Sequence, residues 1–416
     1  MLKERYNLYK RTLLALVILT VWGCGNLYTG DETPVDPGST GGSTGVDDSA
    51  EELPVMLAFN NPNYSAQTRG VGALIPGESD YQEKLKNATF YIYAFARKGE
   101  VDYATRRKDN KPEMCLIDGS TGTQADDRHG KEIVYSGNTS FGKWKDETDQ
   151  PMYNPTQPTN AYDFFAYYVD DAAISNFRRN ADGIDFDVAV DGSQDLMYAK
   201  AELTDEDKKN IESMPTEEKA IASDSWYSTY TARRNIVPVL TMKHQLANVR
   251  FNLTVKMKPD MTITVNNIGL KSIYKGTFKV AGRDASQTGA SFPQSDSGSD
   301  MKVLKFGEEF EPKTLPEQTD ELLAALKNAA LLVPPSNNAT LIIEATSSVK
   351  GDYTLTYPLK DLVKNVNSSN ETLPPGFRAG WKYAINVLIN GPEQISVNVE
   401  TSGWVQGEDL EIDLGG

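Results

Sequence analysis

The sequence predicts an all-β fold built from antiparallel sandwiches. Tyr and Phe are abundant, at 20 and 14 of the 416 residues, and they accompany many Thr and Val, all of which strands favour. Short apolar or alternating runs, bounded by Gly, Pro, Asn and Asp, follow one another along the whole chain. Long helical patterns are few. Successive short strands separated by turn residues are typical of antiparallel β-sandwiches.

Residues 1–23 have the pattern of an export signal. Residues 1–11 carry four basic side chains against one acidic side chain, and residues 12–22 (TLLALVILTVW) are almost wholly apolar. A membrane-spanning helix needs about 20 apolar residues, and this run has roughly half that number. We therefore expect export and not a transmembrane anchor.

Gly23 and Cys24 close this segment in a way that resembles the bacterial lipoprotein signal. The resemblance implies that a signal peptidase cuts between them and that the Cys24 thiol carries diacylglycerol. Acyl chains contribute about 0.8 kcal/mol per buried methylene and so hold a protein on a membrane. Trp22 is bulkier than the pattern usually has, and an ordinary signal with a chance cysteine is the alternative. Cys115 is the only other cysteine, so lipidation of Cys24 leaves no intrachain disulfide.

The chain is acidic, with a formal charge of −16, and removal of the first 23 residues, which carry +3, leaves −19. An acidic surface argues against nucleic acid and anionic lipid as partners. Hydrophobic residues make up 39% of the chain, which is ample for two domains. Residues 24–52 hold little besides Gly, Ser, Thr, Pro and acidic residues, and we expect a flexible acidic tether there.

Residues 53–237 are expected to form an N-terminal β-sandwich domain. Its first strand is residues 53–59 (LPVMLAF), in which Val55, Leu57 and Phe59 share one face. Residues 86–97 (KNATFYIYAFAR) are apolar on both faces, as in a strand buried within a sandwich. Residues 100–160 predict long loops with short strands such as 132–135. The remaining predictions are strands at residues 161–169, 183–190 and 194–200, and a short exposed helix at residues 204–220 that begins at Thr204 and is interrupted at Pro215.

The pattern of apolar and polar residues changes near residue 238, and we place the start of a C-terminal β-sandwich domain, residues 238–416, there. Residues 247–257 alternate between apolar and polar side chains, as a half-buried strand does. Residues 263–280 predict two strands that meet around Gly269 or Gly276. Residues 315–330 predict a helix with three leucines on one face. Further strands are predicted at residues 340–345, 353–358, 381–389, 395–399 and 410–414.

No convergent catalytic set is visible, and we expect no enzyme activity, cofactor or metal. HExxH, GxSxG, P-loop and CxxC motifs are absent. Of the two histidines, His129 lies in a polar run, and His244, beside an alternating strand, is interpreted as a hydrogen-bonded core residue. Asp185, Asp187, Asp191 and Asp195 do not have EF-hand spacing, and the first two are expected to face solvent. The tryptophans could stack on sugars or pack inside the protein; they include Trp144, Trp226 and Trp404.

Several stretches together resemble the fimbrillin family, the subunits of lipoprotein-derived pili of Gram-negative gut and oral anaerobes. Their order and spacing carry the resemblance more than any single motif does. It implies two consecutive transthyretin-like β-sandwich domains, in agreement with a division near residue 238. The stretches are residues 162–168 (YDFFAYY), 194–200 (QDLMYAK), 239–251 (VLTMKHQLANVRF), 331–335 (LLVPP) and 379–383 (AGWKY) through Trp404.

The resemblance also implies assembly by donor-strand exchange. In fimbrillins, an arginine- or lysine-directed protease cuts behind the first strand, that strand leaves, and an extended strand of another subunit fills the groove. The matching cut here is between Arg69 and Gly70. The displaced strand would present Val55, Leu57 and Phe59, and the candidate donor strand would present Leu410, Ile412 and Leu414.

By this resemblance the protein begins as a lipid-anchored precursor in the outer membrane and ends in a fimbrium at the cell surface. Its partners would be other pilus subunits and, for an adhesive tip, a host or bacterial surface ligand. Members that serve as anchors keep their lipid and are not cut. The alternative is therefore a permanently lipid-anchored β-sandwich lipoprotein that binds glycan. The loops predicted across residues 100–160 are longer than those of a minimal stalk subunit. The roles of stalk, tip and anchor therefore all stay open.

Overall fold

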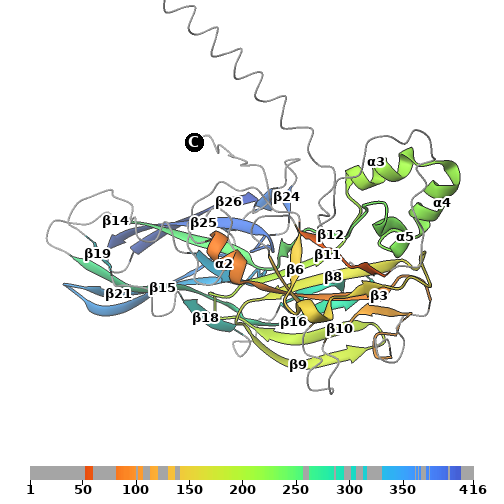
Figure 1. Cartoon of the computed structure of the whole chain (residues 1–416). Coiled ribbons are helices and arrows are strands. Elements are labelled where there is room, and N and C mark those ends of the chain that lie inside the picture. The colour runs from red at the N-terminus through yellow and green to blue at the C-terminus, as the bar shows by residue number, and fades with distance from the viewer. Residues whose placement is uncertain are drawn as a thin grey trace, which may run out of the picture. The chain divides into compact units, whose positions relative to one another are not determined.

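In the computed structural model, strands dominate and pair mainly into four sheets that enclose two sandwich cores (Figure 1). None of the helices in the described part of the chain combines the length and apolarity that crossing a membrane requires. The described residues are 52–59, 81–99, 102–105, 113–119, 130–135, 141–255, 262–284, 287–294, 301–305, 313–315, 330–360, 362–363, 365–366, 372–373, 375–391 and 394–403.

The largest sheet has seven antiparallel strands and belongs to the first sandwich. Its order is β13 (Lys243–His244), β11 (Leu196–Lys200), β8 (Tyr162–Val169), β3 (Thr89–Ala96), β5 (Lys131–Tyr135) and β6 (Gly142–Trp144), and β4 (Cys115–Ile117) also pairs with β3. Both faces of the central strand β3 are buried, with Tyr93 and Phe95 on one and Ile92 and Ala94 on the other. The apolar pattern of residues 86–97 is thereby explained.

One face of this sheet packs against a second, four-stranded sheet. The order of that sheet is β17 (Gly289–Ser291), β16 (Lys275–Gly282), β10 (Gly183–Ala189) and β9 (Ala173–Asn180). Aromatic rings fill the space between the two sheets, with centroids of Tyr167 and Phe186 5.8 Å apart and of Phe186 and Phe278 5.5 Å apart. Strand β16 follows residue 238 in sequence yet pairs with β10. The division of the chain at residues 237 and 238 stays a prediction, and this sheet combines strands from both sides of it.

The second sandwich encloses a largely aliphatic core between two further sheets. Strands β14 and β25 are parallel neighbours over eight residue pairs, whereas the other pairs in these sheets are antiparallel. One sheet has the order β20 (Ala330–Val333), β14 (Ala247–Val255), β25 (Trp381–Gly391) and β26 (Gln394–Gly403). The other has the order β18 (Met301–Lys305), β15 (Ile263–Ile273), β21 (Thr340–Ser347) and β22 (Gly351–Pro358), and β19 (Lys313–Leu315) also pairs with β15.

Short elements complete the described chain. Three two-stranded sheets pair β1 (Leu53–Pro54) with β7 (Met152–Tyr153), β2 (Ala58–Phe59) with β12 (Val239–Leu240), and β23 (Asn365–Val366) with β24 (Thr372–Leu373). The helices are α2 (Tyr81–Asn87), the 3₁₀ helix Glu147–Asp149, α3 (Asp205–Ser213), α4 (Thr216–Asp224) and α5 (Thr229–Ala232).

The all-β prediction is confirmed, and the differences concern single elements. Four short α-helices occur in the described ranges instead of one or two, because α2 and α5 carry too few residues to show a helical period. Thr204 caps α3, and Pro215 separates α3 from α4, as predicted. Leu315 ends strand β19 and Ala330 begins β20, so the predicted helix 315–330 is wrong at both ends, and its middle lies outside the described residues.

Candidate functional site

The N-terminal segment, residues 53–59, lies over the face of the seven-stranded sheet that the four-stranded sheet leaves uncovered. At its start, β1 pairs antiparallel with β7. At its end, β2 pairs parallel with β12, and Ala58 also forms an antiparallel bridge with Phe141. The predicted strand 53–59 is thus two two-residue strands, β1 and β2, joined by residues 55–57, with residues 141–153 on one side and β12 on the other.

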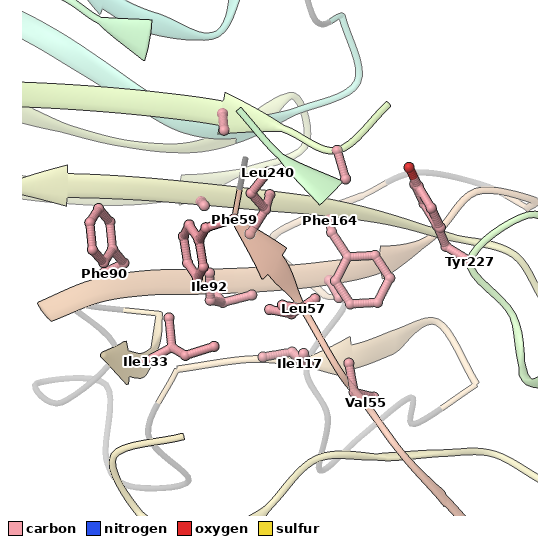
Figure 2. Close-up of a cluster of buried hydrophobic side chains, with 14 of the residues drawn as sticks. Val55, Leu57, Phe59, Phe90, Ile92, Ile117, Ile133, Phe164, Tyr227 and Leu240 are labelled. Carbon is pink, nitrogen blue, oxygen red and sulfur yellow. The ribbon is translucent and has the colours of Figure 1, made fainter. Parts of the chain in front are cut away.

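Its apolar side chains are buried in a second hydrophobic cluster, on the face of the seven-stranded sheet opposite the sandwich core. Val55 is 0% exposed, Leu57 1% and Phe59 6%, whereas Met56 between them is 42% exposed. Figure 2 shows the three buried side chains in one cluster with residues of β3, β4, β5, β8 and β12. The rings of Phe59 and Phe90 lie 5.1 Å apart. The inward alternation expected from the sequence is thus present.

Besides the pairing of β1 with β7 and of β2 with β12, four hydrogen bonds hold the backbone of the N-terminal segment. Val55 N–H donates to the Pro151 carbonyl at 2.8 Å, and Ala58 N–H donates to the Pro238 carbonyl at 2.9 Å. The Leu57 carbonyl accepts from Gly142 N–H at 3.0 Å. The Val55 carbonyl accepts from the indole Nε1–H of Trp144 at 3.0 Å, and this contact is buried. The segment is thus held by backbone groups and by one side-chain donor.

Gly142 makes room for the ring of Phe59. A Cβ built on Gly142 would lie 2.7 Å from Cε2 of Phe59 and 2.5 Å from Cδ1 of Ile133, closer than real side chains approach. The glycine therefore allows β6 to run against both side chains. A larger residue at this position would force the Phe59 ring and the Ile133 side chain to shift.

The tyrosines around the N-terminal segment are neutral at physiological pH. Burial raises the pKa of Tyr153, Tyr162 and Tyr227 above the ordinary tyrosine value, so these phenols keep their protons. All three belong to the cluster that surrounds the N-terminal segment. The described side chains that surround the N-terminal segment in this cluster are hydrophobic.

His244 is a core residue, as interpreted from the sequence. Its Nδ1 lies 2.9 Å from Oδ2 of Asp195, which is completely buried. Asp185 is 9% exposed and pairs with Arg178, so the expectation that it faces solvent is wrong; Asp187 is half-exposed and pairs with the same arginine. Within the described ranges, no three His, Cys, Asp or Glu side chains converge as metal ligands do. His129 lies outside the described residues.

The tryptophans of the first sandwich pack against protein groups. Trp144 is 5% exposed, and the Arg97 guanidinium lies 3.5 Å from the ring centroid of Trp226. Neither ring is a free platform for a sugar. Trp404 lies outside the described residues.

The structure describes only one of the predicted site elements, the N-terminal segment. Four groups that hold it were not expected from the sequence: Gly142, Trp144, Pro151 and Pro238. Val55 and Trp144 are 89 residues apart, and no local pattern indicates such a contact. The other predicted site residues lie outside the described ranges, namely Gly23, Cys24, Arg69, Gly70, Leu410, Ile412 and Leu414.

Comparison with known proteins identifies a family. The fimbrillin-like family model matches residues 105–404. Similar solved structures include a candidate cell adhesion protein from Bacteroides ovatus (13% identity, TM-score 0.43, 86% of this chain and 100% of that one) and another from Bacteroides uniformis (12%, 0.41, 85% and 98%). A third is the fimbrial anchor protein Mfa2 from Porphyromonas gingivalis (13%, 0.30, 85% and 99%). No curated protein matches the chain.

Proposed function

The chain belongs to the fimbrillin-like family, and on that premise we propose that it is a structural or adhesive subunit of a cell-surface fimbria. It is exported as a lipoprotein modified at Cys24 and is anchored in the outer membrane. Cleavage between Arg69 and Gly70 then frees it, and donor-strand exchange with other subunits builds the fimbria. The family is one of structural subunits, and the protein acts by assembly instead of by catalysis.

One observation carries this proposal: the N-terminal segment, which precedes the cleavage position in sequence, pairs with β7 and β12 and buries Val55, Leu57 and Phe59. A cut after Arg69 would break its covalent link to the rest of the sandwich. Its departure would uncover the apolar cluster around Phe90, Ile92 and Phe164. An open groove of this kind adds a strand from a partner, with backbone hydrogen bonds giving affinity and alternate side chains filling pockets. Left unfilled, it would aggregate.

Burial energies indicate how much apolar side chain a replacement strand must bury to bind as well as residues 53–59. Each fully buried Val, Leu or Phe side chain stabilises by about 1.5–3 kcal/mol relative to exposure. Val55, Leu57 and Phe59 are all buried, so the N-terminal segment contributes several kcal/mol. A donor must present three apolar side chains at the same two-residue spacing. Leu410, Ile412 and Leu414 do so, with acidic residues between them.

The test uses the purified full chain treated with an arginine-specific protease. We expect a cut after Arg69, loss of the N-terminal segment and formation of oligomers, or capture of a synthetic peptide with the sequence of residues 405–416. The matched control is Arg69→Ala, which should stay monomeric under the same treatment. A clean cut at Arg69 that yields neither oligomers nor peptide capture would refute strand exchange.

A further inference from the structure

We propose that the groove left by residues 53–59 selects its new occupant by side-chain size, and that this occupant comes from a different subunit and not from a second copy of this chain. The inference rests on the proposed function, because it concerns the strand that enters when residues 53–59 leave. It adds the chemistry of that strand: an aromatic residue at one end, a residue of the size of valine four positions away, and a larger aliphatic residue midway between them.

The end of the groove that holds Phe59, which we call the Phe59 pocket, is shaped for an aromatic ring. The ring of Phe59 lies 5.1 Å from that of Phe90, and the ring of Phe90 lies 5.5 Å from that of Tyr168. Ring pairs of this kind stabilise beyond the area that they bury. Gly142 lies so close to the Phe59 ring that a Cβ does not fit between them. An aliphatic side chain in this pocket would lose the ring contacts and leave a cavity.

The opposite end of the groove, the Val55 pocket, holds a small side chain whose backbone is fixed. Val55 is 0% exposed. Its N–H donates to the Pro151 carbonyl at 2.8 Å, and its carbonyl accepts from the Nε1–H of Trp144 at 3.0 Å. Because both backbone groups of Val55 are bonded, an occupant with a larger side chain here must break these bonds or overpack the site, and both are unfavourable.

The C-terminal segment of this chain has the spacing of residues 53–59 but not their sizes. Either direction of entry would put a leucine into the Phe59 pocket and a leucine into the Val55 pocket, so that the first is underfilled and the second overfilled. Only Ile412, in the place of Leu57, has the size of the side chain that it replaces. Within residues 404–416, these are the three apolar residues that stand two positions apart in a row: Leu410, Ile412 and Leu414.

A strand graded in size would fill all three pockets at once. Residues 53–59 show that the grading is compatible with burial, because Val55, Leu57 and Phe59 are at most 6% exposed. A donor from another subunit with the same grading would restore the ring contacts and keep the bonds at the Val55 pocket. Specificity is a difference between two affinities. The groove would therefore join this chain to an unlike subunit in preference to a copy of itself.

The experiment uses the full chain cut after Arg69 and labelled peptides that compete for the groove during the cut. The reference peptide is residues 405–416. Two variants of it carry the same pair of side chains in opposite order: Leu410→Val with Leu414→Phe, and Leu410→Phe with Leu414→Val. The variants are identical in composition and charge, and each is graded for one direction of entry. We expect one variant to bind at least about tenfold more tightly than both the reference and the other variant.

Gly142→Ala tests the pocket itself, because its Cβ narrows the space that the ring occupies. Leucine tolerates a narrower pocket better than phenylalanine does. The advantage of the tighter variant over the reference should therefore fall at least about threefold in Gly142→Ala. The matched control is Lys143→Ala. The Lys143 side chain is 59% exposed, so this substitution should leave the advantage unchanged.

A peptide of residues 52–59 reports whether the groove is open, and its Phe59→Leu variant repeats the size test without the C-terminal sequence. If the reference peptide binds and neither graded variant binds more tightly, size selection is overturned and strand exchange stays. If the 52–59 peptide binds and no 405–416 peptide does, the C-terminal donor is overturned; weaker binding of the Phe59→Leu variant then supports size selection, and equal binding overturns it.

Binding of no peptide at all overturns both strand exchange and size selection. If Gly142→Ala does not fold, the comparison of the graded variants with the reference in the unsubstituted chain still decides the inference.

Discussion

Leu57 is the residue whose truncation should weaken the N-terminal segment most directly. Its side chain is 1% exposed and lies in the cluster with Ile92, Ile117, Ile133 and Phe164. Leu57→Ala removes buried methyl groups and leaves a cavity, which typically lowers the free energy of unfolding by about 2–4 kcal/mol. At 1.4 kcal/mol per tenfold, the N-terminal segment should bind about 30- to 700-fold more weakly once the chain is cut after Arg69.

Two measurements check this prediction. Urea unfolding of the intact chain gives the free energy of unfolding from the midpoint at unchanged slope. Gel filtration of the protease-treated protein gives the rate at which the fragment separates. Met56→Ala is the matched control: Met56 is 42% exposed, so its truncation should change the free energy by less than about 0.5 kcal/mol. Equal effects of the two substitutions would refute the view that residues 53–59 are held by inward side chains.

Three further predictions follow from other positions. Arg69→Ala should block processing, so that N-terminal sequencing of the cell-surface protein finds no chain that begins at Gly70. Lys98→Ala is the control and should be processed normally. A chain beginning at Gly70 in Arg69→Ala would contradict cleavage directed by Arg69. Gly142→Val should lower the free energy of unfolding by about 1–3 kcal/mol through its clash with Phe59 and Ile133, and Phe59→Leu in the same chain should recover part of that loss. Burial, assisted by the carboxylates of Asp171 and Asp195, raises the pKa of Asp170 to about 7. Because the folded protein holds this proton more tightly than the unfolded chain, the stabilisation is complete below about pH 4 and is lost as the pH rises to about 7. The free energy of unfolding, measured with urea, should therefore fall less between pH 5 and 7 in Asp170→Asn than in the unsubstituted chain. Parallel pH profiles of the two proteins would contradict the raised pKa of Asp170.

Strands of the first sandwich could be predicted where their burial produces a run of apolar residues in the sequence. Strands β3 and β8 are apolar on both faces because both faces of their sheet are covered, and this appears in the sequence as continuous apolar runs. Strand β9 was not predicted. Most of its side chains are exposed and polar, and its strand conformation depends on the ladder with β10 and on pairing of Arg178 with Asp185 and Asp187.

The N-terminal segment could be predicted from the sequence, but the residues that hold it in place could not. The alternation of Val55, Leu57 and Phe59 indicates a buried strand face within seven residues of sequence. The groups that receive this strand come from far along the chain. Pro151 and Pro238 look like turn residues in sequence, Gly142 like a loop residue, and Trp144 like an aromatic of unknown surroundings. Their common role exists only once β6, β7 and β12 are assembled around the N-terminal segment.

The N-terminal sequence of the protein isolated from intact cells tests strand exchange most directly. If residues 53–59 are a temporary occupant of the groove, the assembled protein begins at Gly70 and contains no peptide from residues 24–69. Protein that begins at an acylated Cys24 and retains residues 53–59 in the assembled fibre would contradict strand exchange in this chain.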